Sequence, residues 1–407
     1  MRSLDDTWLL EPSSRVAIVD GHEWRELNQG WEAAPAAPDS HGGEEQLDVL
    51  GWYPAEIPGT AAAVLQRAGV WQLGEHYDFD AEDWWFRTSF DCRAPAAGEE
   101  ISLQLDGLAT VAEVFLNGEL VLASESMFAT HELDVGNRLL ASNTLTIRCR
   151  ALSPLIEEAR RPRARWRTRV AANPNLRFFR TALLGRAPGF APGPATVGPY
   201  RPVRLLRRRR LVVEEVAMRP RLEHERGVIE VDVRLRSLTD DAVSAVEVEC
   251  EGPLGVARTS LALSRGAGRS SWRAKGRLAV PGVSPWWPHT HGEPTLYRVR
   301  LRVRHSDAVV SVDLGATGFR ELRAGADPSR EVDVEREGLH LHINGVPVFA
   351  RGAVWTPIDS VGMAPSTDAL RGALERVRDG GMNMLRIPGT GCYESAAFHD
   401  LCDELGI

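Results

Sequence analysis

The chain has 407 residues, a length that predicts about two to four domains. Its 12 Trp and 11 Phe residues need a core, which excludes a mainly disordered protein, and no stretch of 18 apolar residues is present to span a membrane. The 48 basic and 56 acidic residues give a net charge of −8, which argues against a general nucleic-acid binder.

The first residues and the cysteines indicate the cellular compartment. The stretch Met1–Asp6 contains no apolar segment of signal-peptide length, so we expect a cytoplasmic protein. The number of cysteines is odd and no C-x-x-C pair occurs, which favours buried free thiols over a disulfide framework or a metal site. The cysteines are Cys92, Cys149, Cys250, Cys392 and Cys402.

The first 150 residues alternate apolar and polar side chains in short runs, as half-buried antiparallel strands do. Asn117-Gly118 separates two apolar runs and predicts a hairpin with a type I′ turn. One helix is predicted over Thr60–Ala68. The predicted strands are Trp84–Cys92, Ile101–Leu108, Ala112–Leu116, Glu119–Ala123, Phe128–Val135 and Thr144–Ala151. Such a series is typical of a sandwich or jelly roll.

From residue 159 to residue 202 the alternation stops, and Arg, Pro and Gly predict a long irregular loop. The stretch from Arg160 to Arg210 contains 15 Arg and no Asp or Glu. Three interpretations stay open. The stretch could bind nucleic acid, although it lacks a known motif and repeated aromatic interleaving. It could instead place positive charge over a binding site and favour an acidic ligand. The interpretation that we favour is a solvated loop that pairs with the acidic neighbouring domains.

A second set of alternating strands lies between Leu211 and Leu322. About 110 residues of short strands fit one immunoglobulin-like sandwich. His289 and His291 are interpreted as part of a turn, because no third metal ligand lies near them in sequence. The predicted strands are Ile229–Leu235, Ala245–Cys250, Trp272–Val280, Leu296–Val303 and Val309–Leu314.

The last part of the chain changes to alternating strand and helix. Asn344-Gly345 predicts another hairpin, and Ser366-Thr367-Asp368 caps a predicted helix over Ala369–Arg378. A buried strand is predicted over Met382–Ile387 and a second helix over Tyr393–Leu405. This order is typical of the opening of a parallel α/β unit.

Three groups of motifs recur in a fixed order along the chain. They are Ile57–Thr60, Ala81–Arg87 and Leu105–Gly118 in the first β region, Trp286–Pro288, Gly292–Tyr297 and Gly318–Arg320 in the second, and Ile343–Ser360, Asn383–Arg386 and Leu401–Ile407 in the last part. Their sequence, order and spacing resemble glycoside hydrolase family 2, on its β-mannosidase side. The resemblance spans nearly the whole chain and is more specific for the family than for a substrate.

This resemblance implies a multidomain β plus α/β fold. The expected domains are a jelly-roll β-sandwich over 1–210, which contains the Arg-rich loop 159–202, an immunoglobulin-like β-sandwich over 211–322, and the start of an incomplete (β/α)₈ barrel over 323–407. The expected function is that of the N-terminal portion of a retaining exo-β-glycosidase acting on terminal β-linked sugars. A carbohydrate is then the substrate, and no cofactor, metal, nucleic acid or membrane is expected as a partner.

The last part of the chain departs from the family pattern. A (β/α)₈ barrel needs about 250 residues, whereas the stretch from Glu337 to Ile407 provides 71, or two βα units. The acid/base and nucleophile Glu of the family lie on later strands. We therefore expect no catalytic residue in this chain and no hydrolysis by it alone. The alternatives are a non-catalytic carbohydrate- or protein-binding protein, and a fragment complemented by a second chain that holds the missing barrel portion.

Two further departures concern the sugar. β-Mannosidases of the family carry a Trp-Asp-Trp element before an Arg-Pro-Val-Arg-Leu stretch. The latter is present as Arg201–Leu205, but the region of the former reads Leu184–Phe190. Pro388 follows Arg386-Ile387 where the relatives have a Trp, and proline cannot stack on a sugar as an indole can. The sugar and its linkage therefore stay open, and an acidic sugar is the ligand that one interpretation of the Arg-rich stretch implies.

Four residues near predicted strand ends are candidate substrate-binding residues. The resemblance implies that Arg386 holds the nucleophile's carboxylate through a charge-assisted bond, the alternative being a structural ion pair. Trp355 is expected either to stack on a sugar or to pack in the core, and Asp359 is expected to accept hydrogen bonds from two sugar hydroxyls. Glu394 is expected at the start of the second helix, where an acid offsets the helix dipole.

Overall fold

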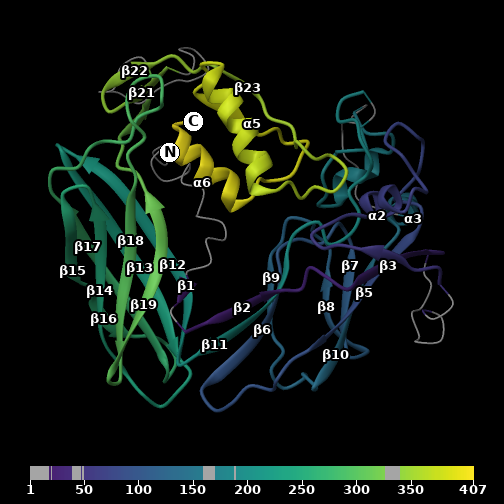
Figure 1. Cartoon of the computed structure of the whole chain (residues 1–407), viewed down its shortest axis with the longest axis horizontal. Helices are drawn as coiled ribbons and strands as arrows, with labels where there is room; N and C mark the ends of the chain where they lie inside the picture. Colours follow the sequence, from purple (N-terminus) through teal and green to yellow (C-terminus); the bar gives the residue numbers. More distant parts are fainter. Residues whose placement is uncertain are drawn as a thin grey trace.

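The computed structural model describes residues 18–19, 21–38, 47, 50–158, 170–187, 189–325 and 340–407. Its strands form two β sandwiches, which Figure 1 shows on opposite sides of the molecule, with a segment of short strands and helices at one end. The expectation of a mainly β chain with sandwich domains is confirmed. Within the described residues, no helix has the length and apolar character that crossing a membrane requires.

The first sandwich consists of two antiparallel sheets, with strand orders β4-β3-β5-β10-β7-β8 and β2-β11-β6-β9. Their facing surfaces bury Trp31, Trp84, Phe86, Leu103 and Leu145 in one core. The strands are β2 (Glu23–Glu26), β3 (Trp31–Ala36), β4 (Tyr53–Ala55), β5 (Asp83–Asp91), β6 (Glu99–Leu105), β7 (Ala112–Leu116), β8 (Glu119–Ser124), β9 (His131–Asp134), β10 (Ser142–Cys149) and β11 (Val203–Arg209).

Alternation located the central strands of this sandwich, from β5 to β10, with ends that differ by a few residues. Strand β3 escaped prediction because its Ala and Pro residues are poor strand formers, and it forms where Ala33 pairs with Phe86 of β5. Asn117 and Gly118 have φ values of 53° and 80°. The predicted hairpin turn between β7 and β8 is therefore confirmed.

Two helices flank this sandwich. The predicted helix is present as α2 (Ala61–Arg67), and its N-cap residue Thr60 accepts a hydrogen bond from the Ala63 N–H. Helix α3 (Leu152–Glu158) was not predicted. The expected irregular loop 159–202 contains a short 3₁₀ helix, η2 (Pro174–Phe178), while its residues 159–169 and 188 lie outside the described part.

The second sandwich has a sheet of order β1-β19-β18-β14-β15 and a sheet of order β12-β13-β17-β16. Its core contains Ile229, Val248, Leu278, Leu301 and Phe319. The strands are β1 (Ile18–Val19), β12 (Leu211–Glu223), β13 (Arg226–Ser237), β14 (Val243–Gly252), β15 (Gly255–Ser260), β16 (Ala262–Arg265), β17 (Ser271–Val280), β18 (Tyr297–His305) and β19 (Ala308–Thr317).

Strand β1 lies in the second sandwich although residues 1–210 were expected to belong to the first domain. Ile18 pairs with Asp313 and Val19 with Val312, so this short strand occupies the edge of β19. The following strand, β2, pairs with β11 of the first sandwich. The chain therefore connects the two sandwiches near its start as well as between β11 and β12.

The C-terminal segment begins with an antiparallel sheet of β20 (Leu322–Ala324), β21 (Leu341–Ile343) and β22 (Val346–Val348). Strands β23 (Gly352–Val354) and β24 (Met384–Arg386) then form a parallel pair. Helices α5 (Thr367–Asp379) and α6 (Ala396–Leu405) pack against each other through apolar side chains. The order strand, helix, strand, helix agrees with the sequence-based expectation.

Two details of this segment differ from the expectation. Strand β24 was predicted as a buried strand, but two of its residues are half-buried and Arg386 is exposed. A parallel strand is buried only when elements cover both of its faces, and among the described residues β24 pairs with β23 alone. Helix α6 begins at Ala396 rather than at Tyr393, because the Ser395 hydroxyl caps it by accepting from the Phe398 N–H.

A turn of the second sandwich anchors the C-terminal segment. Trp286 donates its indole N–H to the Asp403 carbonyl at 2.8 Å, and the His289 ring nitrogen Nε2 donates to the Met382 carbonyl at 2.8 Å. The Asn383 carboxamide donates to the Thr290 hydroxyl at 3.0 Å. The two histidines flanking Thr290 therefore lie in a turn, as expected, and His289 connects two domains.

Candidate functional site

The carboxyl ends of β23 and β24 bring the candidate residues to one edge of the structure. Val354 lies opposite Arg386 in the parallel register, and the Trp355 N–H donates to the Arg386 carbonyl at 2.9 Å. The loops that follow each strand start from this edge. In parallel α/β barrels this edge is the one on which active sites are built.

Trp355 lies mostly in the core. Only 7% of the residue is exposed, and its ring packs against Phe398 of α6 at a centroid distance of 5.1 Å. Its indole N–H donates to the Glu394 carboxylate at 2.9 Å. The structure thus places Trp355 in the packing position that was the alternative to sugar stacking.

Glu394 connects the two strand-end loops. It stands immediately before the N-cap residue Ser395, so it lies outside helix α6 rather than in its first turn. Its carboxylate is half-buried and accepts the Trp355 indole N–H. Glu394 therefore fixes the loop before α6 against the end of β23, a role that the sequence did not indicate.

The Asp359 carboxylate organises the loop after β23. One oxygen, Oδ1, accepts the backbone N–H groups of Val361 at 3.1 Å and Gly362 at 2.8 Å. The other, Oδ2, accepts from the Ala364 N–H at 3.4 Å. A Cβ atom on Gly362 would lie 2.6 Å from Oδ2, so a larger residue there would displace the carboxylate from its present position.

Among the four candidate residues, Arg386 is the one whose side chain makes the fewest contacts with its neighbours in the described ranges. It ends β24, it is exposed, and its guanidinium forms no hydrogen bond or ion pair with any residue in the described ranges. The alternative of a structural ion pair therefore finds no support among those residues. The strand end presents a cation that is able to bind a carboxylate.

The first sandwich holds both strand-end loops in place. The buried hydroxyl of Thr60 donates to the Val361 carbonyl at 2.6 Å, and Val361 packs into the core of this sandwich. On the other side, the Leu183 N–H donates to the Thr390 carbonyl at 2.9 Å. Residues from both domains also form one small apolar cluster, which contains Ala109, Met127, Ala182, Leu184, Tyr200, Met363 and Cys392.

A buried ion pair shapes the irregular stretch around Arg186. The Arg186 guanidinium binds both oxygens of the Asp80 carboxylate at 2.7 Å, and it also donates to the Ala182 and Thr196 carbonyls. Only 5% of the Arg186 side chain and 9% of the Asp80 side chain are exposed. Sequence reasoning missed this pair, because the residues are 106 positions apart and neither belongs to a recognisable motif.

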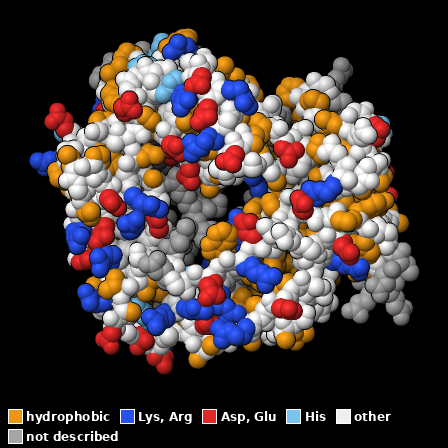
Figure 2. Space-filling view, in the orientation of Figure 1, with side chains coloured by type: hydrophobic (Ala, Val, Ile, Leu, Met, Phe, Trp, Pro, Cys, Tyr) orange, Lys and Arg blue, Asp and Glu red, His pale blue; other side chains and the backbone are white. Residues whose placement is uncertain are grey.

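Ion pairing explains the described arginines of strand β11. Arg204 pairs with Glu26 and Asp106, Arg207 and Arg209 with Glu99, and Arg208 with Glu100 and Glu132. The Ala96 backbone N–H together with Arg207 and Arg209 lowers the pKa of Glu99 to about 2. On the face seen in Figure 2, basic and acidic side chains alternate instead of forming a field of one sign. The β11 arginines thus form ion pairs within the first sandwich itself, whereas the favoured interpretation expected pairing with neighbouring domains. The arginines of the stretch between residues 160 and 169 lie outside the described residues.

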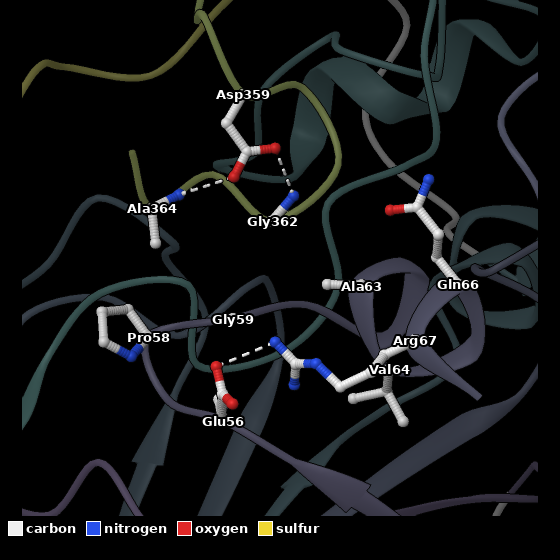
Figure 3. A pocket seen from close by; sticks show the side chains of 10 residues that line it. All are labelled: Glu56, Pro58, Gly59, Ala63, Val64, Gln66, Arg67, Asp359, Gly362 and Ala364. Atoms are coloured by element: carbon white, nitrogen blue, oxygen red, sulfur yellow. Dashed lines mark hydrogen bonds and ion pairs between the residues drawn. The ribbon is translucent and has the colours of Figure 1, made fainter. Parts of the chain in front are cut away.

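A cleft lies between helix α2 and the loop after β23. Its volume is about 430 Å³. Figure 3 shows Glu56, Pro58, Ala63 and Arg67 on the wall from the first sandwich, and Asp359 with Gly362 and Ala364 on the opposite wall. No sequence pattern indicated this cleft, because its walls are about 300 residues apart in the chain. Among the described residues, no three His, Cys, Asp or Glu side chains are grouped to hold a metal ion.

Each of the two sandwiches matches a known protein-family model. Residues 31–201 match the family model "Glycosyl hydrolase 2 galactose-binding domain-like", and residues 211–320 match the model "Glycosyl hydrolases family 2". Together the two matches cover most of the chain and correspond to the first and second sandwich.

Curated relatives with similar sequences include β-mannosidases. β-Mannosidase B of Aspergillus terreus is 28% identical over 331 residues, which cover 80% of this chain and 38% of that protein. The β-mannosidase of Rattus norvegicus is 25% identical over 382 residues, which cover 87% of this chain and 42% of that protein. The chain thus spans less than half the length of these relatives.

Solved structures share the fold. The β-D-mannosidase of Dictyoglomus thermophilum superimposes with a TM-score of 0.76 and 25% sequence identity, over 95% of this chain and 46% of that chain. A putative β-galactosidase from Bacteroides fragilis superimposes with a TM-score of 0.66 and 20% identity, over 95% of this chain and 52% of that chain. The motifs, the two family models and this fold agree: the chain belongs to glycoside hydrolase family 2 and, within it, resembles the β-mannosidases.

Proposed function

We propose that the chain is the N-terminal portion of a retaining exo-β-glycosidase that hydrolyses terminal β-linked sugars, with β-mannosides as the first candidates. The observation that carries the proposal is the strand-end site. An exposed Arg386 ends β24 beside loops held by the first sandwich, in a chain 28% identical to β-mannosidase B of Aspergillus terreus. The residues 323–407 are then the first two βα units of a (β/α)₈ barrel.

In the proposed retaining mechanism, Arg386 supports the nucleophile and is not one of the two catalytic groups. Two carboxyl groups about 5 Å apart are needed, one to protonate the leaving oxygen and one to attack the anomeric carbon. The described carboxylates at the strand ends already have partners, since Asp359 accepts backbone N–H groups and Glu394 accepts from Trp355. The catalytic pair is therefore proposed to lie on further barrel strands, with Arg386 keeping the nucleophile ionised through a charge-assisted bond.

It follows that these 407 residues alone do not hydrolyse glycosides. The test is to incubate the purified chain with nitrophenyl β-mannoside, β-glucoside, β-galactoside and β-glucuronide. Turnover that is lost when one of the chain's own residues is replaced would overturn the proposal of inactivity. The substrate class is tested on the protein isolated from its own source through an antibody against this chain. A preference for the β-mannoside supports the β-mannosidase type, and a preference for another sugar rejects it.

The alternative is a second chain that supplies further barrel strands, and the exposure of strand β23 supports the need for such a cover. All three residues of β23 are exposed, and in the described part β23 pairs with β24 alone. Exposed parallel strands need further strands or helices to cover them. Mass spectrometry of the protein isolated from its source distinguishes a longer single chain from a complex of two chains. A 407-residue protein without a partner would instead favour a non-catalytic binding protein.

We also propose that the protein works in the cytoplasm. All five cysteines are free, and burial raises the pKa of the Cys250 and Cys392 thiols to about 11. Free buried thiols are typical of reducing compartments. Cell fractionation with an antibody against the chain tests this proposal, and recovery from the secreted fraction would reject it.

A further inference from the structure

The cleft between α2 and the loop after β23 has a fixed shape. The Thr60 hydroxyl caps α2 and also donates to the Val361 carbonyl of the opposite wall. Val361 itself packs in the core of the first sandwich. Both walls are thus fastened to the same core, and the cleft is formed before any ligand arrives. Its volume of about 430 Å³ lies within the range of roughly 300–1,000 Å³ that is usual for small-molecule sites.

The polar groups of the cleft suit hydroxyl groups. Arg67 and Glu56 form an ion pair at 2.8 Å whose side chains are 48% and 67% exposed, so both have unused donors or acceptors. Gln66 is exposed, and its carboxamide forms no hydrogen bond with a residue in the described ranges. Asp359 Oδ2 has one long contact with the Ala364 N–H and retains acceptor capacity. Donors and acceptors therefore lie on both sides of the space (Figure 3).

The remaining lining is apolar and small. Pro58, Ala63 and Val64 form part of the wall from the first sandwich. A sugar ring presents hydroxyls at its rim and C–H groups on its faces, so it matches a cleft that combines both kinds of surface. The ionisable lining residues are two acids, Glu56 and Asp359, and one base, Arg67. This balance disfavours ligands that carry a carboxylate or a phosphate.

We propose that this cleft is a binding subsite for a neutral sugar unit of an oligosaccharide. The inference rests on the proposed function, because Asp359 stands on the loop that leaves the strand end carrying the candidate active site. The subsite takes a unit beyond the one held at the strand ends. An oligosaccharide then binds more tightly than a single sugar, and the gain depends on residues of α2.

Hydrogen exchange with mass spectrometry tests the proposal without requiring activity. The full chain is titrated with β-1,4-mannobiose, methyl β-mannoside and glucuronic acid, and the exchange of peptides covering 61–67, 359–364 and 387–394 is followed. Mannobiose is expected to slow exchange in the first two peptides. Methyl β-mannoside is expected to have a smaller effect on them, and glucuronic acid none.

Two variants block the cleft in different ways. Gln66→Ala combined with Arg67→Ala removes exposed polar groups, and Ala63→Phe fills the space while leaving those groups in place. Each is expected to weaken mannobiose binding about fivefold or more, the effect of losing one or more hydrogen bonds. The matched control is Arg138→Ala, which removes a similarly exposed arginine that faces Glu119 away from the cleft and leaves binding unchanged.

The outcomes separate this proposal from the proposed function. Protection of 387–394 by mannobiose without protection of 61–67 overturns the subsite and leaves the strand-end site standing. Unchanged binding in the double variant also overturns the subsite. Glucuronic acid that protects the cleft as well as mannobiose does would refute the assignment to neutral sugars.

Discussion

Replacing Arg186 with methionine removes one half of the buried ion pair that shapes the loop between residues 181 and 197. The guanidinium makes five hydrogen bonds, two to Asp80 at 2.7 Å, one to the Thr181 hydroxyl and two to the Ala182 and Thr196 carbonyls. Removing one partner of a buried pair leaves an uncompensated charge, which costs about 3–5 kcal/mol. We therefore expect Arg186→Met to destabilise the first sandwich by about that amount.

The assay has to report on one domain, because a chain of several domains has no single free energy of unfolding. Urea unfolding followed through hydrogen exchange of peptides from β5 and β10 isolates the first sandwich. The control Arg138→Ala removes an exposed arginine 3.9 Å from Glu119 and is expected to cost less than about 1 kcal/mol. A double variant with Asp80→Asn should recover part of the loss. A cost below about 1 kcal/mol for Arg186→Met would refute the reasoning.

Three further predictions concern stability at other sites. Burial lowers the pKa of His305, whose ring contacts the Ser237 hydroxyl at 2.8 Å. The second sandwich should therefore lose stability as the pH falls below the ordinary histidine pKa of 6.5. In urea titrations from pH 8 to pH 5, His305→Asn should lack this pH-dependent loss, and a variant with the wild-type pH profile would contradict the prediction. Thr60→Ala removes both the cap of α2 and the bond to Val361. Urea unfolding followed through hydrogen exchange of first-sandwich peptides should show a loss of about 1–3 kcal/mol that Thr60→Ser largely restores. Arg386→Ala should change stability by less than about 0.5 kcal/mol, because the side chain has no partner within the described ranges, and a larger loss would indicate a structural role.

Much of the fold could be predicted from local pattern. Alternation marked strands such as β7 and β13 because each has one face in a core and one in solvent. Strand β3 could not be found this way, since its Ala and Pro residues carry no strand signal and it forms through pairing with β4 and β5. Strand β1 joins the second sandwich through a pairing with β19 that is about 290 residues distant in sequence.

The candidate site was predictable in position but not in detail. Parallel pairing of β23 and β24 fixes which residues share an edge, so Trp355 and Arg386 came together as expected. The partners of their side chains depend on tertiary packing. Phe398 covers the Trp355 ring, the Asp359 carboxylate turns to its own loop, and Asp80 pairs with Arg186 over 106 positions. No local pattern encodes these contacts.

The measurement that most directly tests the account compares the wild-type protein with its Arg386→Ala variant. Both are isolated from the source through an antibody against this chain, and hydrolysis of nitrophenyl β-mannoside is followed. The proposed role of Arg386 in holding the nucleophile predicts a loss in kcat of about 10²-fold or more, with partial rescue by Arg386→Lys and folding unchanged. β-Mannoside turnover that survives unaltered in Arg386→Ala, or that is absent from the wild-type protein, would contradict the account.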